Sequence, residues 1–120
     1  MEKKNLDWKH IGFAYHTTDY RYVADYKDGK WQEGYLSDSP TVVLNECAGI
    51  LQYCQEVFEG LKAYETADGR IVTFRSDLNA DRMYHSAERM EMPPFPRERF
   101  VEAVEQVVKA NEAWVPPYGS

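Results

Sequence analysis

Gly60 and Arg82 are the two residues in this 120-residue sequence whose type and position first suggest a binding site. Gly60 falls in an expected strand, where a glycine lets a ligand or another backbone approach closely, although a β-bulge would also explain it. Arg82 falls in the first turns of an expected helix, where its guanidinium could form paired hydrogen bonds with a phosphate or a carboxylate. Spacing alone favours the simpler explanations, which are a bulge at Gly60 and a solvated helix face around Arg82.

Two aromatic residues near Gly60 could form the wall of a pocket. Phe58 has the same strand parity as Gly60, so both would face one side, and Tyr53 lies five residues before Phe58. An apolar wall beside an open backbone patch suits a small-molecule site. Buried aromatic residues more often fill a core, so the pattern by itself leaves both interpretations open.

Hydrolytic, nucleophilic and metal chemistry have little support in the sequence. The three histidines accompany no nucleophile motif and have no metal-ligand spacing, and the two cysteines are seven positions apart without a partner set for zinc. A pair of carboxylates could act as acid and base, but nothing in the sequence gives such a pair a pocket. We therefore predict no metal site and no catalytic role for His10, His16, His85, Cys47, Cys54, Glu56 and Glu59.

Composition limits the classes of function. The 14 basic and 20 acidic residues give a net charge of −6, which disfavours a nucleic-acid surface. The 43% of hydrophobic residues are enough for a packed core, and 120 residues suit one domain. The charged amino-terminal residues differ from a secretory signal, and no apolar stretch approaches the ~20 residues that cross a bilayer. We expect a soluble, cytoplasmic protein with reduced thiols that binds small molecules or proteins, and neither nucleic acid nor membrane.

The first half of the sequence predicts β-structure. Alternating side chains over residues 18–26 are typical of a half-buried strand, and Asp28-Gly29 could form the tight turn of a hairpin whose return strand is 30–36. The β-branched run at residues 41–44 predicts a third strand. Residues 45–52 have mixed signals and could contain a short helical turn.

A second hairpin and two helices are expected next. Residues 57–66 predict a strand that contains Gly60, and Asp68-Gly69 predicts a turn into a strand over residues 71–74. Strands followed by helices predict an α+β fold, in which an antiparallel sheet packs against two C-terminal helices.

The boundaries of the two helices follow from caps and prolines. The first helix should be capped by Ser76 or Asp77 and end at Pro93-Pro94, and the second should open at Pro96 and be closed by Pro116-Pro117. Their expected buried faces, read from apolar residues at helical spacing, are Ala80, Met83, Ala87 and Met90 in the first and Phe100, Val104, Val107 and Val108 in the second.

The segment from Leu51 to Tyr64 closely resembles the Leu-x-Tyr-x-x-x-x-Phe-Glu-Gly segment of branched-chain amino-acid aminotransferases. Ser76, where proline is common in the family, and His85, where arginine or asparagine is common, depart from the usual pattern. The resemblance implies the small amino-terminal domain of a fold-type IV pyridoxal-phosphate enzyme. Further matches, in the order of the family, are Asp68-Gly69-Arg70, Phe74-Arg75, Leu78-Asn79, Arg82-Met83, Ser86-Ala87, Arg89, Pro93-Pro94 and Trp114-Val115-Pro116-Pro117.

The resemblance also implies roles for single residues. Arg82 corresponds to the arginine that binds the cofactor phosphate, and a guanidinium fork suits a phosphate dianion. Phe13, Tyr53 and Phe58 correspond to residues that line the pocket for the branched side chain, where aromatic rings favour aliphatic groups by apolar burial. Gly60 corresponds to the opening that lets the substrate approach the backbone.

By the same resemblance, residues 1–115 are the small domain, residues 116–120 begin an interdomain connector, and the large catalytic domain is absent from this chain. The family's Schiff-base lysine, its pyridinium-nitrogen glutamate and a later arginine motif for the substrate carboxylate all belong to that second domain. We therefore expect no catalytic residue among these 120 residues and no turnover by this chain alone.

The reaction that the resemblance implies is reversible transfer of the amino group of leucine, isoleucine or valine to 2-oxoglutarate in branched-chain amino acid biosynthesis. The complete enzyme is expected to be a homodimer that uses pyridoxal 5′-phosphate. Two alternatives stay open: the small domain of a related fold-type IV enzyme, such as a D-amino-acid aminotransferase or aminodeoxychorismate lyase, and a binding module without catalysis.

Overall fold

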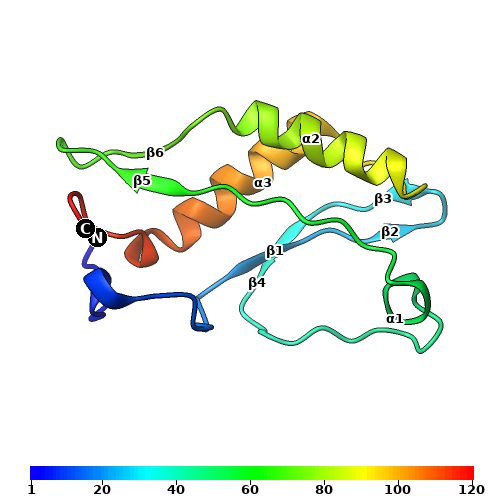
Figure 1. Cartoon of the computed structure of the whole chain (residues 1–120), viewed down its shortest axis with the longest axis horizontal. Coiled ribbons are helices and arrows are strands. Elements are labelled where there is room, and N and C mark those ends of the chain that lie inside the picture. The colour runs from blue at the N-terminus through cyan, green and yellow to red at the C-terminus, as the bar shows by residue number, and fades with distance from the viewer.

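The computed structural model describes all 120 residues and confirms the predicted α+β class, with short antiparallel strands and two main helices toward the C-terminus (Figure 1). The two main helices are α2 (Ser76–Arg89) and α3 (Arg97–Ala110). The strands form three separate two-stranded ladders, β1 with β4, β2 with β3, and β5 with β6. The remaining elements are η1 (Trp8–His10), β1 (Arg21–Val23), β2 (Tyr26–Lys27), β3 (Lys30–Trp31), β4 (Tyr35–Ser37), α1 (Gly49–Tyr53), β5 (Ala63–Glu65), β6 (Ile71–Thr73) and η2 (Glu112–Trp114).

The first predicted hairpin is present, but one extra residue interrupts it. Asp28 and Gly29 have φ angles of 54° and 76°, which confirms the tight primed turn between β2 and β3. Two residues separate β1 from β2, whereas three separate β3 from β4. The return side of the hairpin therefore has one extra residue, which interrupts the ladder between the β2–β3 pair and the β1–β4 pair. A side chain at Gly34 would overlap the outer part of the Tyr22 ring, so glycine leaves room for the ring in its present position.

Two predicted strands differ in the structure. Residues 41–44 form no strand, and Val43 is 94% exposed, because β-branched residues need a neighbouring strand to pair with and none lies beside them. The predicted strand at 57–66 shrinks to β5, since its partner β6 ends at Thr73 before the chain enters α2. Gly60 therefore lies outside any ladder, and the bulge interpretation was wrong. The uncertain stretch 45–52 does contain helical residues, at the start of α1.

The two helices meet through small side chains. Ala80 and Ala87 of α2 are 1% and 4% exposed, and Ala103 of α3 is also buried, so the backbones approach closely. Arg97 stacks over the ring of Tyr84 at 3.8 Å, and its Nε donates to Asp81 at 2.8 Å, which fixes α3 against α2. The second helix ends at Ala110, and η2 fills the span before Pro116 that the sequence had assigned to the helix.

Polar contacts attach the strands to the helices. The side-chain amide of Asn111 pairs with both backbone groups of Tyr20, at 2.9 and 2.7 Å, and also donates to the carbonyl of Val107 at 2.9 Å. The indole N–H of Trp31 donates to the carbonyl of Pro94 at 2.9 Å, and its ring packs edge-on against Phe95. The first hairpin is thereby held at both ends of α3.

The N-terminal segment packs against the C-terminal one. The backbone N–H of Lys4 donates to the carbonyl of Ala113 at 3.0 Å, and the Lys4 ammonium lies 5.2 Å from the centroid of the Trp114 ring. Figure 1 shows both termini at the same end of the molecule. No helix has the length and apolar character needed to cross a membrane.

The chain exposes more surface than its size predicts. Only five residues are buried, all of them alanine or valine, and the accessible surface is 9246 Å². A compact monomer of this mass would expose about 6,700 Å². The radius of gyration is 16.0 Å, against about 14 Å for a compact domain of this length. The chain therefore exposes about 2,500 Å² more surface than a compact monomer of its mass would.

Replacing Asn111 with alanine should destabilise the fold. The change removes two hydrogen bonds that join the end of α3 to the segment before β1 and a third to the carbonyl of Val107 within α3, so we expect the free energy of unfolding to fall by about 1–3 kcal/mol in urea titrations. Asn5→Ala is the control, because Asn5 is exposed; it should change stability by less than about 0.5 kcal/mol. Equal stability of the two variants would contradict the role of Asn111.

Candidate functional site

The candidate site forms where the extended chain between α1 and β5 runs along α2 (Figure 1). The Gln55 side-chain amide donates to the carbonyl of Met90 at 2.9 Å, and the Asn79 amide donates to the carbonyl of Gly60 at 3.1 Å. Gln55 thus lies beside the C-terminal end of α2 and Gly60 beside its N-terminal part, so the extended segment runs antiparallel to α2. This arrangement places Phe58 and Gly60 next to Arg82.

Arg82 and Glu59 form the principal ion pair of the site. Arg82 Nε donates to Glu59 Oε2 at 2.6 Å, and Nη2 donates to Oε1. Glu59 uses only one edge of the guanidinium, the edge formed by Nε and Nη2. The N–H groups of Nη1 and the second N–H of Nη2 face away from this contact, and together they form a second fork that suits a phosphate or carboxylate.

Glu59 and Arg82 both stay charged near neutral pH. Hydrogen bonding from Arg82 is the largest cause that lowers the pKa of Glu59 from 4.5 to about 2; burial acts in the opposite direction, and Asn79 and Gly60 add further stabilisation of the carboxylate. The hydrogen bond to Glu59 in turn raises the pKa of Arg82. The side chain of Glu59 is 3% exposed, whereas that of Arg82 is 67% exposed. The carboxylate is therefore covered while the guanidinium faces solvent.

An open depression adjoins the exposed side of Arg82. It holds about 450 Å³, and it combines apolar groups with cationic and hydroxyl donors. His85 contacts Glu88 at 3.2 Å and Asp81 at 3.5 Å, whereas Arg89 forms no ion pair. Such a set of donors can bind an anion that also carries an apolar group. The lining residues are Val57, Phe58, Arg82, His85, Ser86, Arg89 and Met90.

The structure brings together three of the five residues predicted for the site. Phe58 and Arg82 line the same depression, and the ring of Phe58 reaches 3.4 Å from where a Cβ on Gly60 would lie. Phe13 follows η1, and Tyr53 is the last residue of α1; neither lines the depression beside Arg82. Phe13 is fully exposed and Tyr53 is 84% exposed. An aromatic wall formed by all three rings does not exist within this chain alone.

Glu59 and Asn79 are the site residues that sequence reasoning missed. The sequence placed Glu59 among unassigned carboxylates, but its side chain accepts hydrogen bonds from Arg82, from Asn79 at 2.9 Å and from the N–H of Gly60 at 3.2 Å. Asn79 and Arg82 are three residues apart on α2, and a spacing of three places two side chains on one helix face. That spacing was the available signal for Asn79, whereas Glu59 was signalled only as the glutamate of the Phe-Glu-Gly motif, to which no role was assigned.

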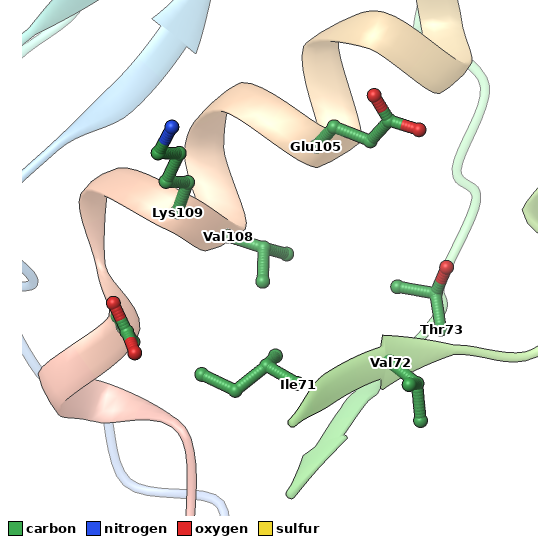
Figure 2. Close-up of a pocket in the computed structure, with 7 residues that line it drawn as sticks. Ile71, Val72, Thr73, Glu105, Val108 and Lys109 are labelled. Atoms are coloured by element: carbon green, nitrogen blue, oxygen red, sulfur yellow. The ribbon is translucent and has the colours of Figure 1, made fainter. Parts of the chain in front are cut away.

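A second depression, of about 370 Å³, lies between β6 and α3, away from Arg82 (Figure 2). Ile71 and Val108 form its apolar part, and Glu105 and Lys109 stand on α3 above it. None of the residues predicted for the site lines it. No group of three His, Cys, Asp or Glu side chains is placed to hold a metal ion, and both cysteines are free and exposed.

Acid should remove the stabilisation that the ion pair provides. Because the folded-state pKa of Glu59 is lowered, this stabilisation is complete above the unfolded value of 4.5 and is lost as the pH falls toward about 2. The shift corresponds to about 3 kcal/mol, which exposure of Arg82 to solvent reduces to about 1–2 kcal/mol. The difference in free energy of unfolding between the wild type and Glu59→Gln should therefore narrow from pH 6 to pH 3 in urea titrations.

The control for this pH dependence is Glu56→Gln, because Glu56 is an exposed carboxylate on the same segment. Its stability difference from the wild type should stay constant over the same pH range. A Glu59→Gln difference that does not change with pH would contradict the proposed ionic contribution.

Comparison with curated proteins gives relatives of known activity. The chain is 51% identical over 117 residues to a branched-chain-amino-acid aminotransferase of Haemophilus influenzae and 44% identical over 117 residues to one of Helicobacter pylori; each match covers 98% of this chain and 34% of the relative. A methionine aminotransferase of Arabidopsis thaliana is 45% identical over 96% of the chain, which corresponds to 33% of that relative. No protein-family model matches.

The chain spans about a third of the length of the curated relatives that it matches. The similarity includes the segment that carries Phe58, Glu59 and Gly60 as well as the helix that carries Arg82, because the matches cover nearly the whole chain. Over almost its entire length, the chain is therefore homologous to about one third of a branched-chain-amino-acid aminotransferase.

Proposed function

We propose that residues 1–115 form the small domain, and residues 116–120 the start of a connector, of a pyridoxal-phosphate-dependent transaminase with a larger second domain. The proposed reaction moves the amino group of leucine, isoleucine or valine to 2-oxoglutarate, in the cytoplasm. The observation that carries the proposal is the identity of 44–51% with branched-chain-amino-acid aminotransferases over 98% of the chain.

The donors around Arg82 fit the phosphate of pyridoxal 5′-phosphate. Glu59 occupies one edge of the guanidinium, and Arg82 lines a depression that also contains Ser86 and Arg89. A phosphate dianion is bound well by a planar pair of N–H donors and by a second cation close by. When bound, the cofactor supplies the electron sink for the chemistry at the substrate. In this proposal, Arg82 anchors the cofactor and takes no part in proton transfer.

Phe58 and Gly60 support the proposed substrate side of the site. The ring of Phe58 provides apolar surface, and Gly60 leaves its backbone uncovered beside that ring. A branched aliphatic side chain gains free energy by burial against such a ring. Phe13 and Tyr53 join the pocket in this proposal only when other parts of the enzyme cover them, because neither lines the depression beside Arg82 here. The unbranched thioether substrate named for the Arabidopsis thaliana relative would also suit apolar walls.

The exposed surface of the chain supports the proposed larger assembly. The excess of about 2,500 Å² over a compact monomer lies at the upper end of the roughly 1,000–2,500 Å² that one partner contributes to an obligate interface. Exposed apolar residues are frequent around α1, where Val43, Leu51 and Tyr53 are each more than half exposed. We propose that the large domain and a second subunit cover this surface in a homodimer.

Loss of the Arg82 guanidinium should weaken binding of phosphate esters. We expect Arg82→Ala to raise the dissociation constant for pyridoxal 5′-phosphate at least about tenfold, because charge-assisted hydrogen bonds to the phosphate are lost. NMR titration of the isotope-labelled chain measures this, with pyridoxal as the ligand that lacks the phosphate. Arg70→Ala is the control, since Arg70 is also exposed and ion-paired, with Asp68 at 3.0 Å. Equal affinities of the wild type and Arg82→Ala would contradict the proposal.

The chain alone should not catalyse transamination. None of its seven lysines lines the depression beside Arg82, so no amine is placed to hold the cofactor or to move a proton. With pyridoxal 5′-phosphate, leucine and 2-oxoglutarate, glutamate should form no faster than in the same mixture without protein. A protein-dependent rate would show that this chain carries the catalytic groups itself.

A further inference from the structure

We infer that Glu59 is a positioning residue for anion binding, and that it orients the guanidinium of Arg82 so that the free edge faces the phosphate. This inference rests on the proposed function, because it needs Arg82 to bind a phosphate. It assigns a role to a carboxylate that does not itself touch the anion. The role follows from how Glu59 is held and from which edge of Arg82 it occupies.

The carboxylate of Glu59 is fixed from several sides. Its Oε1 accepts hydrogen bonds from the Asn79 amide at 2.9 Å and from the N–H of Gly60 at 3.2 Å, and the Asn79 amide also donates to the carbonyl of Gly60. The side chain is 3% exposed. Glu59 is thus attached both to its own segment and to α2, which makes it a rigid partner for a mobile side chain.

Arg82 is a side chain that needs such a partner. It is 67% exposed, and a free arginine would lose much of its rotamer freedom when it binds a ligand. Two hydrogen bonds from Nε and Nη2 to one carboxylate fix both the position and the plane of the guanidinium. Most of the entropy cost of ordering the Arg82 side chain therefore arises when the chain folds, and less of this cost remains when an anion binds.

Glu59 could instead act as a competing counterion, which an incoming phosphate would displace. The structure argues against displacement, because it would leave a covered carboxylate without its main cation. The phosphate can use the opposite edge of Arg82, so both anions can bind the same guanidinium. The two roles predict opposite effects of removing Glu59. If Glu59 positions Arg82, its removal weakens anion binding; if Glu59 competes with the anion, its removal strengthens binding.

The test uses Glu59→Asp, which keeps the charge but shortens the side chain by one methylene group, so that the carboxylate no longer reaches both N–H groups. We expect the dissociation constants for inorganic phosphate and pyridoxal 5′-phosphate to rise about 3- to 10-fold in NMR titrations, the factor for ordering one flexible side chain. Glu59→Gln should also bind more weakly. The control is Glu56→Asp, which makes the same change at an exposed position on this segment.

Two further measurements separate positioning from a purely structural role. The Nε–H of Arg82 should exchange slowly with solvent in the wild type and rapidly in Glu59→Asp. Asn79→Ala keeps the charge pair but loosens the carboxylate, so it should weaken phosphate binding by a smaller factor. Folding of each variant is checked by near-UV circular dichroism, and the Asn79 variant carries the test if the Glu59 variants unfold.

Each outcome decides between the roles. Tighter or unchanged phosphate binding by folded Glu59→Asp and Glu59→Gln would overturn the positioning role, even if their stability falls. If the wild type binds phosphate no better than Arg82→Ala, the proposed function of Arg82 fails instead. If binding depends on Arg82 but not on Glu59 or Asn79, the proposed function stands and only this inference is rejected.

Discussion

The contact between Glu59 and Arg82 determines where the extended segment between α1 and β5 lies. This segment has no strand to pair with, so its backbone cannot be held by a ladder of hydrogen bonds. Side chains attach it to α2 instead, through the charge pair, through Asn79 to Gly60 and through Gln55 to Met90. Phe58 and Gly60 take their positions beside Arg82 from these contacts. A site formed in this way depends on polar geometry more than on apolar burial.

The helices provide the rigid part of that arrangement. Alanines at the contact let α2 and α3 approach closely, and Arg97 binds across the contact to Tyr84 and Asp81. The buried set contains no large side chain, so apolar burial within the chain contributes little per residue. The stability of the folded chain thus depends strongly on hydrogen bonds such as those of Trp31 and Asn111. Apolar packing elsewhere in the chain would not offset their loss.

The sequence predicted correctly those elements that depend on residues close together in the chain. The primed turn at Asp28-Gly29 and the two helices follow from backbone preferences and from apolar periodicity, and all three are present. The strand predicted at 41–44 was wrong, and the strand predicted at 57–66 is present only as β5. A strand requires a partner, and the presence of a partner is a property of the whole fold. Residue type and position made Arg82 and Phe58 candidates, and the resemblance gave each of them a role. Glu59 was missed because its role depends on which side chain lies opposite, 23 positions away along the chain.

The exposure of Arg82 gives a physical reason for the larger enzyme that we propose around this chain. In water, two unit charges at 4 Å attract each other by only about 1 kcal/mol, whereas near a protein surface of lower effective dielectric the same pair reaches about 4 kcal/mol. Arg82 is 67% exposed, so in the proposed function its free edge alone would provide only a weak phosphate site. A cover that excludes water would strengthen the contact without moving Arg82, because Glu59 already holds the guanidinium in place. Closure by the rest of the proposed enzyme would cover the exposed apolar surface around α1, and it would also strengthen phosphate binding by Arg82.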